Sequence, residues 1–453
     1  MIRAVRGTRD LLPPETALWN FVEAAARDVF RAYNFHEIRT PILEETQLFA
    51  RSVGDDVSKQ MYSFVASPKV AARPLEAGAK GTGTLTQTPT PEIQDSKLEK
   101  AEEGKSLTLR PENTAGVVRA YIQHHLSERP GLQRLYYIGP QFRRERQQKG
   151  RFRQFYQIGA EVIGPPTAGS ESPAVDAEVL EMLATLLDRV GISGWTLELN
   201  SVGCAHDRPK FDAALRKALV GTVKKMCADC QRRAETNPLR VFDCKVPEDQ
   251  PVIEKLPRMV EFLDDACRAH FTEVQEILKA VEVPFTLNDR LVRGLDYYTR
   301  TAFEFTHGAL GAQNAILGGG RYDGLSESLG GPRAPGIGFA IGEDRLVMTL
   351  AEATPAVGHV LQAYIAPLGA GMNREAARLA RELRRHDLVV ELGDESFRLK
   401  KSLETASKLG ARFVVIVGEN EVKSGAFAMK NLASGEQVSV PRAELAAKIQ
   451  SLR

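Results

Sequence analysis

Apolar positions along the chain follow helical spacing in some stretches and strand spacing in others, which predicts a mixed α and β protein. Between residues 19 and 33, apolar side chains recur three and four positions apart behind Pro13-Pro14-Glu15, a pattern that predicts an N-terminal helix. A second helix is predicted at 177–190. Strands are predicted at 35–43, 107–110, 195–200 and 300–306. Amphipathic helical spacing dominates 204–288 and predicts a helical insertion.

Beyond residue 358 the pattern changes to strands alternating with helices. We predict a strand at 361–366, a helix at 375–386 and a strand at 413–417. The last strand is continuously apolar, as in sheets covered on both faces. Pro355 and Gly358 mark a linker at 351–358. Residues 359–453 therefore form a separate small α/β domain.

Residues 66–106 differ in composition from the rest of the chain. No aromatic residue occurs between positions 66 and 105, and Pro, Thr, Ala, Gly and Lys dominate. Such a segment cannot bury enough apolar area to offset its ordering entropy. We expect a flexible, low-complexity insertion.

Length and charge narrow the class of protein only slightly. A chain of 453 residues is too long for one ordinary core, so two or three domains are expected. The 60 Lys and Arg nearly balance the 58 Asp and Glu, so the total charge identifies no partner. No secretory leader or membrane-length apolar run occurs. We expect a cytoplasmic protein that makes no use of a membrane.

The segment 142–161 (FRRERQQKGRFRQFYQIGAE) concentrates positive charge. Its aromatic and aliphatic flanks around Gln-Gln-Lys-Gly predict a β-hairpin with a long loop. Because side chains alternate across a strand, Arg143 and Glu145 share one face of the first arm. Arg153, Phe155, Gln157 and Glu161 share a face of the second arm. Such a face suits a polar ligand; the alternative is a solvated cationic hairpin.

Three further segments combine glycine with arginine: LVRGLDYY at 291–298, AILGGGRYDGL at 315–325 and GIGFAIGEDRL at 336–346. Glycine admits a ligand close to the backbone, and arginine offers a planar fork for phosphate or carboxylate. Arg143, Arg293, Arg321 and Arg345 together predict a polyphosphate site. No P-loop sequence occurs, so strand side chains would hold the phosphates. Each segment alone also fits an ordinary turn.

Four of the five cysteines lie between residues 204 and 244. Cys204, Cys227, Cys230 and Cys244 could supply four thiolates to zinc. The alternative is a set of ordinary thiols in a reducing compartment. The sequence leaves both open.

Several motifs resemble those of bacterial histidyl-tRNA synthetases, which are class II aminoacyl-tRNA synthetases. They are GTRDLLP at 7–13, IRTP at 38–41, TLRPE at 108–112, NPLR at 237–240, and the hairpin and glycine segments above. The C-terminal run at 399–419 matches as well. The resemblance implies an α+β catalytic domain, with an antiparallel sheet flanked by helices, at 1–203 and 289–350. It also implies a helical insertion domain at 204–288 and an anticodon-binding α/β domain at 359–453.

The resemblance also implies an activity. Such enzymes activate L-histidine with ATP to histidyl-adenylate, release pyrophosphate, and transfer histidine to the 3′ end of tRNA(His). ATP is then a substrate, and Mg²⁺ is expected on its outer phosphates. No residue of the chain is expected to serve as a metal ligand. A homodimer built around residues 38–49 is expected.

Roles carry over from the family motif by motif. The expected catalytic residues are Arg143 and Arg293. ATP is expected at Arg143, Glu145 and Arg345. Histidine is expected at Glu112, Thr114, Gln157, Glu161, Arg293, Tyr297 and Tyr298. The tRNA acceptor end is expected at Gln148 and Lys149. Within the histidine set, Glu161 and Tyr298 correspond to the positions that bind the imidazole nitrogens, although either tyrosine alone also fits core packing.

Two positions depart from the family pattern. Asn113 replaces the commoner glycine, and Gln147 replaces a usual proline. Three rival readings remain: the paralogous regulatory subunit of ATP phosphoribosyltransferase, another class II synthetase, and a nonspecific RNA-binding protein. The presence of Arg143, Glu145, Arg293 and Arg345 and of residues 359–453 argues against the first rival. RGLDYY and Glu161 argue against the second, and the acids aligned with the hairpin arginines against the third.

Overall fold

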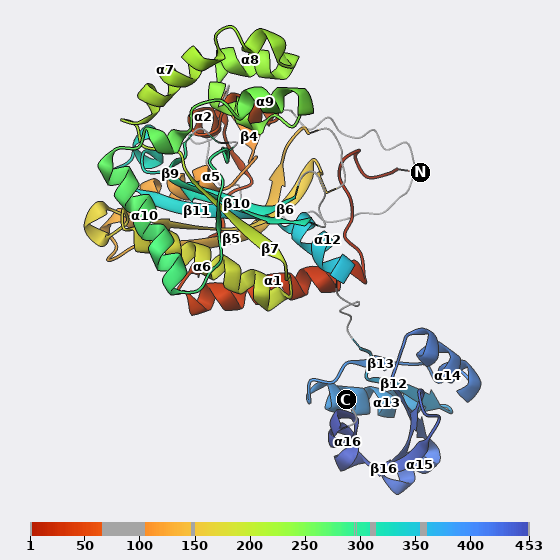
Figure 1. Cartoon of the computed structure of the whole chain (residues 1–453). Coiled ribbons are helices and arrows are strands. Elements are labelled where there is room, and N and C mark those ends of the chain that lie inside the picture. The colour runs from red at the N-terminus through yellow and green to blue at the C-terminus, as the bar shows by residue number, and fades with distance from the viewer. Residues whose placement is uncertain are drawn as a thin grey trace, which may run out of the picture. The chain divides into compact units, whose positions relative to one another are not determined.

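The computed structural model describes residues 2–65, 105–145, 150–293, 295, 297–308, 314–353 and 360–451 (Figure 1). The chain divides into two compact units, residues 1–355 and 356–453. Among the described residues, none of the helices combines the length and apolar character needed to cross a membrane.

An eight-stranded sheet organises the first unit. In spatial order its strands are β1 (His36–Glu37), β5 (Gln133–Phe142), β6 (Gln154–Ile163), β11 (Gly336–Gly342), β10 (Ala315–Arg321), β9 (Thr299–His307), β7 (Trp195–Ser201) and β8 (Thr286–Leu287). Pairing from β5 to β7 is antiparallel, and only the short edge strands β1 and β8 pair in parallel. The predicted fold class, an antiparallel sheet flanked by helices, is confirmed.

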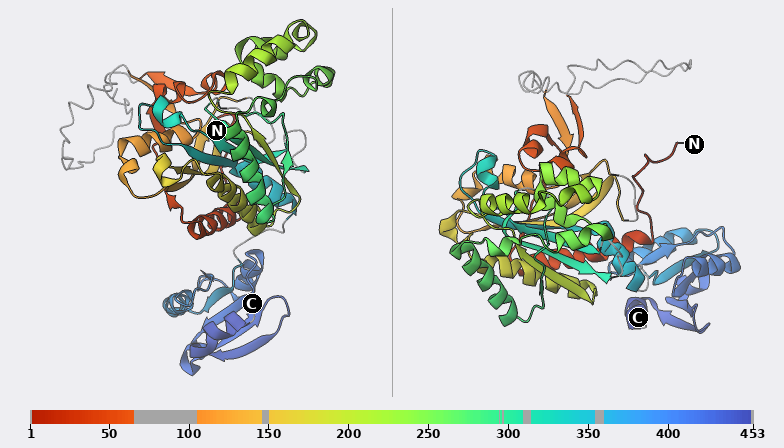
Figure 2. Two further views of the ribbon diagram at one scale, coloured as in Figure 1. Left: turned by 60° about the vertical axis from the view of Figure 1, so that its left-hand side comes forward. Right: turned by 45° about the horizontal axis from the view of Figure 1, so that its top comes forward.

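One face of this sheet is covered by helices whose apolar stripes make the main core. They are α1 (Glu15–Ala32), α6 (Pro173–Val190), α10 (Asp265–Ala280) and α12 (Glu343–Ala353). Figures 1 and 2 show α1 and α6 side by side along the sheet. Helix α6 begins at Pro173 behind Ser172, whose hydroxyl accepts from Ala174 N–H, and ends at left-handed Gly191. These end signals fix its length.

A smaller group of elements contains a second sheet. Its strands pair in the order β2 (Leu43–Glu45), β4 (Ser106–Leu109) and β3 (Tyr62–Val65). The accompanying helices are α2 (Thr46–Ala50), α3 (Asp55–Ser58), α5 (Thr114–Gln123), the 3-10 turn η1 (Leu126–Glu128) and α11 (Leu325–Ser328), whereas the 3-10 turn η2 (Pro166–Ala168) directly precedes α6 in the chain. The expected flexible insertion 66–106 lies outside the described residues up to position 104, but Ser106 already belongs to β4.

The predicted continuous strand at 35–43 is wrong. The structure has two short strands, β1 and β2, with Arg39–Ile42 between them outside any strand. Pro41 has no N–H for a ladder. The carbonyl and hydroxyl of Thr40 both accept from the guanidinium of Arg110, at 2.9 Å each. Local chemistry therefore breaks the strand at this point.

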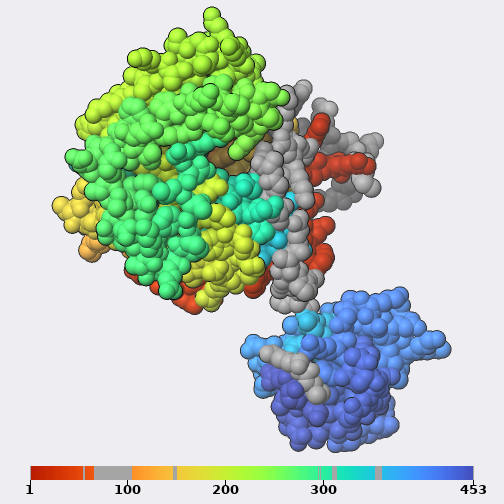
Figure 3. Space-filling model, viewed as in Figure 1, coloured from red at the N-terminus to blue at the C-terminus, as the bar shows by residue number. Residues whose placement is uncertain are grey.

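The helical insertion has a core of its own. Its elements are α7 (Arg208–Leu219), η3 (Val223–Lys225), α8 (Ala228–Thr236), η4 (Pro238–Asp243), η5 (Pro247–Asp249), α9 (Gln250–Ile253) and η6 (Met259–Glu261). Phe211, Val241 and Ile253 are buried together there. Helix α10, by contrast, packs on α6 in the main core. In Figure 3 the insertion forms the yellow-green and green surface at the top of the first unit.

The second unit is an independent α/β fold. Its sheet runs β13 (Val390–Leu392), β12 (Ala363–Leu368), β14 (Phe413–Gly418), β15 (Ala426–Asn431) and β16 (Gln437–Pro441). Its helices are α13 (Met372–Arg384), α14 (Leu399–Lys408), α15 (Glu419–Ser424), η8 (Arg442–Glu444) and α16 (Leu445–Ser451). Every residue of β14 is buried, since separate apolar clusters cover the two sheet faces. The strands predicted at 361–366 and 413–417 are confirmed.

Candidate active site

Three arginines from distant parts of the chain line one cavity of about 310 Å³. Arg143 follows β5, Arg293 precedes β9, and Arg345 lies in the first turn of α12. Phe155 and Gln157 of β6 line the same cavity. The structure therefore brings together three of the four arginines that the sequence grouped into a polyphosphate site.

The fourth, Arg321, is elsewhere, and its predicted contribution to that site is wrong. Its side chain is completely buried. It pairs with the carboxylate of Asp176 on α6, and its Nη1 lies 3.1 Å from Asp323 Oδ1. The pairing of β10 with β9 shifts register between Gly320 and Arg321, so Arg321 stands at an irregular point of the sheet. Arg321 ties β10 to α6 and has a structural role.

Arg293 is held flat on the sheet by an acid and a glycine. Its Nη1 lies 2.5 Å from Glu304 Oε1 on β9. A Cβ at Gly318 would lie 2.5–2.6 Å from the guanidinium, so only glycine leaves room for it. Burial lowers the pKa of Arg293, but the Glu304 carboxylate, together with Tyr298 and Asp243, more than offsets this and the net pKa is raised. Glu304 was not predicted as a site residue, because nothing in its strand distinguishes it from an ordinary strand acid.

Arg143 follows β5, which pairs with β6, whereas Arg293 precedes β9. Its Nε donates to the carbonyl of Pro111 at 2.8 Å, and its guanidinium lies 5.2 Å from the centre of the Phe155 ring. Burial lowers the pKa of Arg143, opposed by the nearby carboxylates of Glu145 and Glu112. The guanidinium is thus oriented by a neutral carbonyl and an aromatic face and keeps donors for a ligand.

A second cavity, of about 190 Å³, adjoins the first and shares part of its wall. Residues that line both cavities are Arg143, Gln157, Arg293, Gly318 and Ala340. The second cavity is otherwise lined by, among others, Glu112, Thr114, Tyr137, Tyr297 and Tyr298. Two guanidinium groups therefore stand at the junction, where they can neutralise two anions that meet there.

Glu112 and Thr114 shape the smaller cavity at the start of α5. The Glu112 carboxylate accepts Thr114 N–H at 2.7 Å and Ala115 N–H at 3.0 Å, and burial raises its pKa. Asn113, the departure from the family glycine, has φ −117°, a conformation open to any residue. Its side-chain oxygen accepts from the Thr40 hydroxyl at 2.6 Å. The turn at 112–114 does not require glycine.

Glu161 lies fully buried beside the smaller cavity. Tyr322 donates to Glu161 Oε2 and Thr114 to Oε1, both at 2.7 Å. Opposite it on β11 is Gly338, where a Cβ would come within 1.7 Å of the carboxylate. Burial raises the pKa of Glu161 to about 8. Tyr322 lies within the glycine–arginine segment 315–325, and no role was predicted for it from the sequence.

The remaining predicted residues divide between this site and its surroundings. Glu145 lines the first cavity, and its carboxylate lies 3.2 Å from Arg151 Nη1. Arg153 does not share the cavity face with Phe155 and Gln157, because it precedes β6 and its Nη1 donates to the carbonyl of Arg6. Gln148 and Lys149 lie outside the described residues.

The four-cysteine zinc set considered from the sequence does not form. Cys227, Cys230 and Cys244 come together, but Cys204 belongs to another group, with Asp207, Asp264 and Cys267. Cys204 lies between β7 and α7, whereas the other three lie around α8 and η4. The two groups are part of different turns of the insertion.

Comparisons with known proteins agree on one family over the full chain. The family description "Histidyl-tRNA synthetase" matches residues 84–346, and "Anticodon binding domain" matches residues 362–452. A protein named Histidine--tRNA ligase from Koribacter versatilis is 63% identical, covering 100% of this chain and 96% of that protein. One of the same name from Solibacter usitatus is 53% identical, covering 100% and 99%. The crystal structure of apo S. aureus histidyl-tRNA synthetase matches with a TM-score of 0.76 and 32% identity, covering 99% of this chain and 100% of that one.

Proposed function

The chain belongs to the histidyl-tRNA synthetase family and has histidine–tRNA ligase activity, and we propose that its two adjoining cavities hold ATP and L-histidine. The larger cavity takes ATP and the smaller takes the amino acid. The observation that carries this assignment is the shared wall, where Arg143 and Arg293 both line the two cavities.

Activation requires two anions to react with each other. The carboxylate of histidine attacks the α-phosphate of ATP, a carboxylate–phosphate bond forms, and pyrophosphate leaves. Arg143 and Arg293 neutralise the approach and stabilise the charge that develops on the phosphoryl oxygens. Because Pro111, Phe155 and Glu304 already orient both guanidinium groups, little reorganisation is needed at the moment of reaction.

The outer part of the larger cavity suits the rest of ATP. Arg345 and Glu145 line it, and we assign Arg345 to adenine and the γ-phosphate and Glu145 to the adenine side. Mg²⁺ neutralises the outer phosphates when bound with ATP. No carboxylate of this wall is assigned to the ion, because Glu304 pairs with Arg293 and Glu145 is assigned to the adenine side.

Polar groups of the smaller cavity fit histidine. Glu112, Thr114 and Gln157 surround the place for the α-ammonium group, and Gln157 Oε1 has no hydrogen-bond partner among the described residues. Glu161 and Tyr298, with Tyr297 beside them, bind the imidazole nitrogens. An amino acid without ring N–H gives Glu161 no donor beyond Tyr322 and Thr114, and a buried mismatch of this kind costs up to ~10⁴-fold in discrimination.

We assign the second step, transfer of histidine to tRNA(His), to the first unit, and we assign part of the tRNA binding to the second unit. Residues 362–452, which match the anticodon-binding family, recognise the anticodon end. Gln148 and Lys149, which lie between β5 and β6 in the sequence, contact the acceptor end, where basic residues position phosphates. The enzyme acts in the cytoplasm.

A homodimer formed around residues 38–49 completes the proposal. Ile42 and Leu43 in this segment are each 42% exposed, a high value for adjacent large apolar side chains. Analytical ultracentrifugation across a concentration range tests the dimer, and a monomer at micromolar protein refutes it.

Pyrophosphate exchange with ATP, measured separately for each standard amino acid, tests the substrate assignment. Histidine alone is expected to support exchange. Exchange with another amino acid and not with histidine overturns the assignment. No exchange from folded protein would favour the regulatory-subunit reading.

A further inference from the structure

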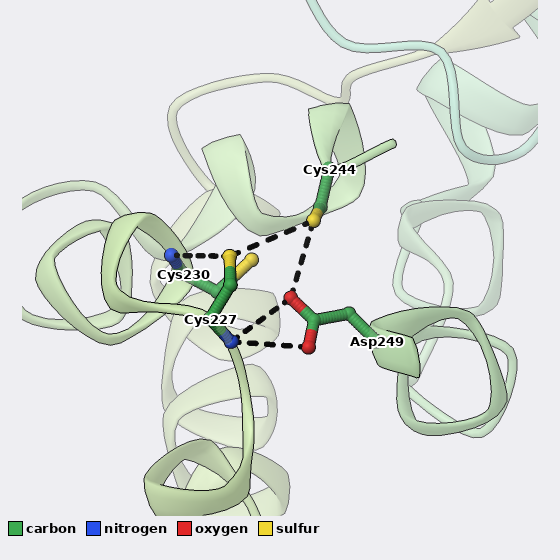
Figure 4. Close-up of side chains that lie close together, drawn as sticks. All are labelled: Cys227, Cys230, Cys244 and Asp249. Atoms are coloured by element: carbon green, nitrogen blue, oxygen red, sulfur yellow. Dashed lines mark hydrogen bonds between the residues drawn. The ribbon is translucent and has the colours of Figure 1, made fainter. Parts of the chain in front are cut away.

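Three cysteines and one aspartate of the helical insertion face one another around a single point (Figure 4). Cys227 directly precedes α8, Cys230 lies in its first turn, Cys244 follows η4, and Asp249 ends η5. One ligand atom from each residue lies within 4.8 Å of all the others. Cys230, Cys244 and Asp249 are at most 5% exposed, so the group lies inside the insertion's core.

The spacing of the donors fits a tetrahedral metal ion. The Sγ atoms of Cys227 and Cys244 are 3.9 Å apart, and Cys244 Sγ is 3.2 Å from Asp249 Oδ2. Zinc–sulfur bonds of about 2.3 Å in a tetrahedron separate sulfurs by about 3.8 Å. The observed group therefore needs little movement to close on zinc.

Backbone amides already orient two of the sulfurs. Cys230 N–H donates to Cys227 Sγ, and Val246 N–H donates to Cys244 Sγ, each at 3.4 Å. Amide donors of this kind stabilise negative charge on sulfur and fix its direction toward a metal. The turn after Cys227 and the turn after Cys244 thus present their sulfurs in the same way.

The charge of Asp249 supports a cation at this place. Its side chain is 2% exposed, and among the described residues neither Lys nor Arg forms an ion pair with it. Its partners are the N–H of Cys227 and the thiol of Cys244. The two oxygens of Asp249 share one N–H donor, whereas the equally buried Asp207 accepts two separate N–H groups, and a divalent ion would supply the charge compensation that Asp249 lacks.

We propose that Cys227, Cys230, Cys244 and Asp249 bind one structural Zn²⁺. Four protein ligands close the coordination sphere, as in structural rather than catalytic zinc sites. Asp243, Cys244, Lys245 and Gln250 also line a cavity of about 950 Å³ that includes Arg143 and Arg345. The ion therefore fixes the segment that forms one wall beside the active site.

The second group in the insertion provides a matched control. Cys204, Asp207, Asp264 and Cys267 offer only two sulfurs. Asp264 caps α10 by accepting Cys267 N–H at 2.7 Å, and Asp207 accepts the N–H groups of Cys204 and Asp264. These bonds explain both acids without a metal.

Metal analysis of the tag-free, full-length enzyme tests the proposal. The protein is incubated with Zn²⁺ and a reductant, dialysed, and analysed by mass spectrometry of the metal. One zinc per chain is expected, lost in Cys227→Ser and in Cys244→Ser and retained in Cys204→Ser. Absence of stoichiometric zinc overturns the proposal, as does zinc that Cys204→Ser removes and Cys227→Ser keeps.

Cysteine variants that unfold would also lose zinc, so substitutions at Asp249 give a second measurement. Asp249→Cys keeps four ligands and is expected to retain the ion. With Co²⁺ in place of zinc, it should show stronger thiolate charge-transfer absorption than the unaltered enzyme. Asp249→Asn should weaken zinc binding about tenfold or more. Identical cobalt spectra for the unaltered enzyme and Asp249→Cys exclude Asp249 as a ligand and overturn the proposal.

Discussion

The phenol of Tyr322 donates a 2.7 Å hydrogen bond to the carboxylate of Glu161, although the two residues are 161 positions apart. Thr114 occupies the other carboxylate oxygen, so Glu161 is fixed in one orientation. The acid that we propose as the partner of the substrate imidazole therefore depends for its position on two other motifs.

Tyr322→Phe should weaken histidine binding without affecting ATP. The change removes one hydrogen bond to the Glu161 carboxyl, worth about 1–3 kcal/mol, or roughly five- to a hundredfold in the KM for histidine. Pyrophosphate exchange at varied histidine and varied ATP measures both constants. Tyr121→Phe is the control, because Tyr121 is buried in the same cluster and lines neither cavity. Equal effects of the two changes would contradict the role of Tyr322.

Glu161→Gln should raise the KM for histidine far more than the KM for ATP. It should also remove a pH dependence. Burial raises the pKa of Glu161 to about 8, so in the free enzyme this carboxyl ionises and becomes the stronger acceptor as pH rises through 8. The ratio of variant to unaltered KM for histidine should therefore increase from pH 7 to pH 9. Titration of the substrate itself is common to both enzymes and cancels; a flat ratio argues against the assignment.

Arg293→Ala should abolish histidine-dependent pyrophosphate exchange. Loss of one positioned donor on a developing charge costs ~10²–10³-fold, and here the carboxylate of Glu304 is also left unpaired. Arg333→Ala serves as the control, since the Arg333 side chain is 64% exposed and pairs with Glu171. Exchange at the unaltered rate in Arg293→Ala would refute the catalytic role.

Glu343→Gln should stabilise the first unit, increasingly so at higher pH. Glu343 is fully buried in α12, and neither of its carboxylate oxygens has a hydrogen-bond partner among the described residues. Burial raises its pKa to about 9 from the ordinary 4.5. The folded state thus keeps a proton that the unfolded state loses, and stability falls as pH rises from 4.5 toward 9 by about 1.4 kcal/mol per unit.

Thermal unfolding of the two proteins at pH 5.5 and pH 8 measures this difference. The gap in unfolding temperature between Glu343→Gln and the unaltered enzyme should widen at the higher pH. Glu327→Gln, at the short helix α11, is the control and should show no such widening. A gap that is the same at both pH values would mean that Glu343 does not hold a proton in the folded enzyme.

Removal of residues 359–453 should weaken charging of tRNA while leaving much of adenylate formation. Both cavities are lined by residues of the first unit alone, and the second unit is a separate compact fold. Aminoacylation and pyrophosphate exchange are measured on the same preparation, so retained exchange reports that the first unit is folded. Unchanged charging would show that residues 359–453 are not needed for tRNA recognition.

Much of the fold was predictable because its elements carry strong local signals. Continuous burial of β14 and the apolar stripe of α6 are visible as apolar periodicity in the sequence. The break in the strand at Arg39–Ile42 could not be predicted from local sequence. It depends on Arg110, a residue far along the chain that donates hydrogen bonds to the carbonyl and hydroxyl of Thr40.

Convergence of Arg143, Arg293 and Arg345 was predictable from motifs, but the exclusion of Arg321 was not. All four arginines stand near glycines, and only tertiary packing shows that Asp176 on α6 faces the last of them. Glu304 and Tyr322 were missed for the same reason. Their partners, Arg293 and Glu161, become neighbours only when the β-sheet forms.

The wall shared by the two cavities also has a consequence for inhibition. Under the proposed assignment of the two cavities to ATP and histidine, a stable compound that joins an imidazole and an ammonium group to adenosine, through a linker that cannot hydrolyse, would occupy both cavities at once. Tethering makes the second half of such a compound bind at an effective concentration set by the linker, which multiplies affinity by ~10²–10⁴ over separate fragments. Gln157 and the guanidinium groups of Arg143 and Arg293 line both cavities and would face the linker. The linker should therefore carry hydrogen-bond acceptors at that point.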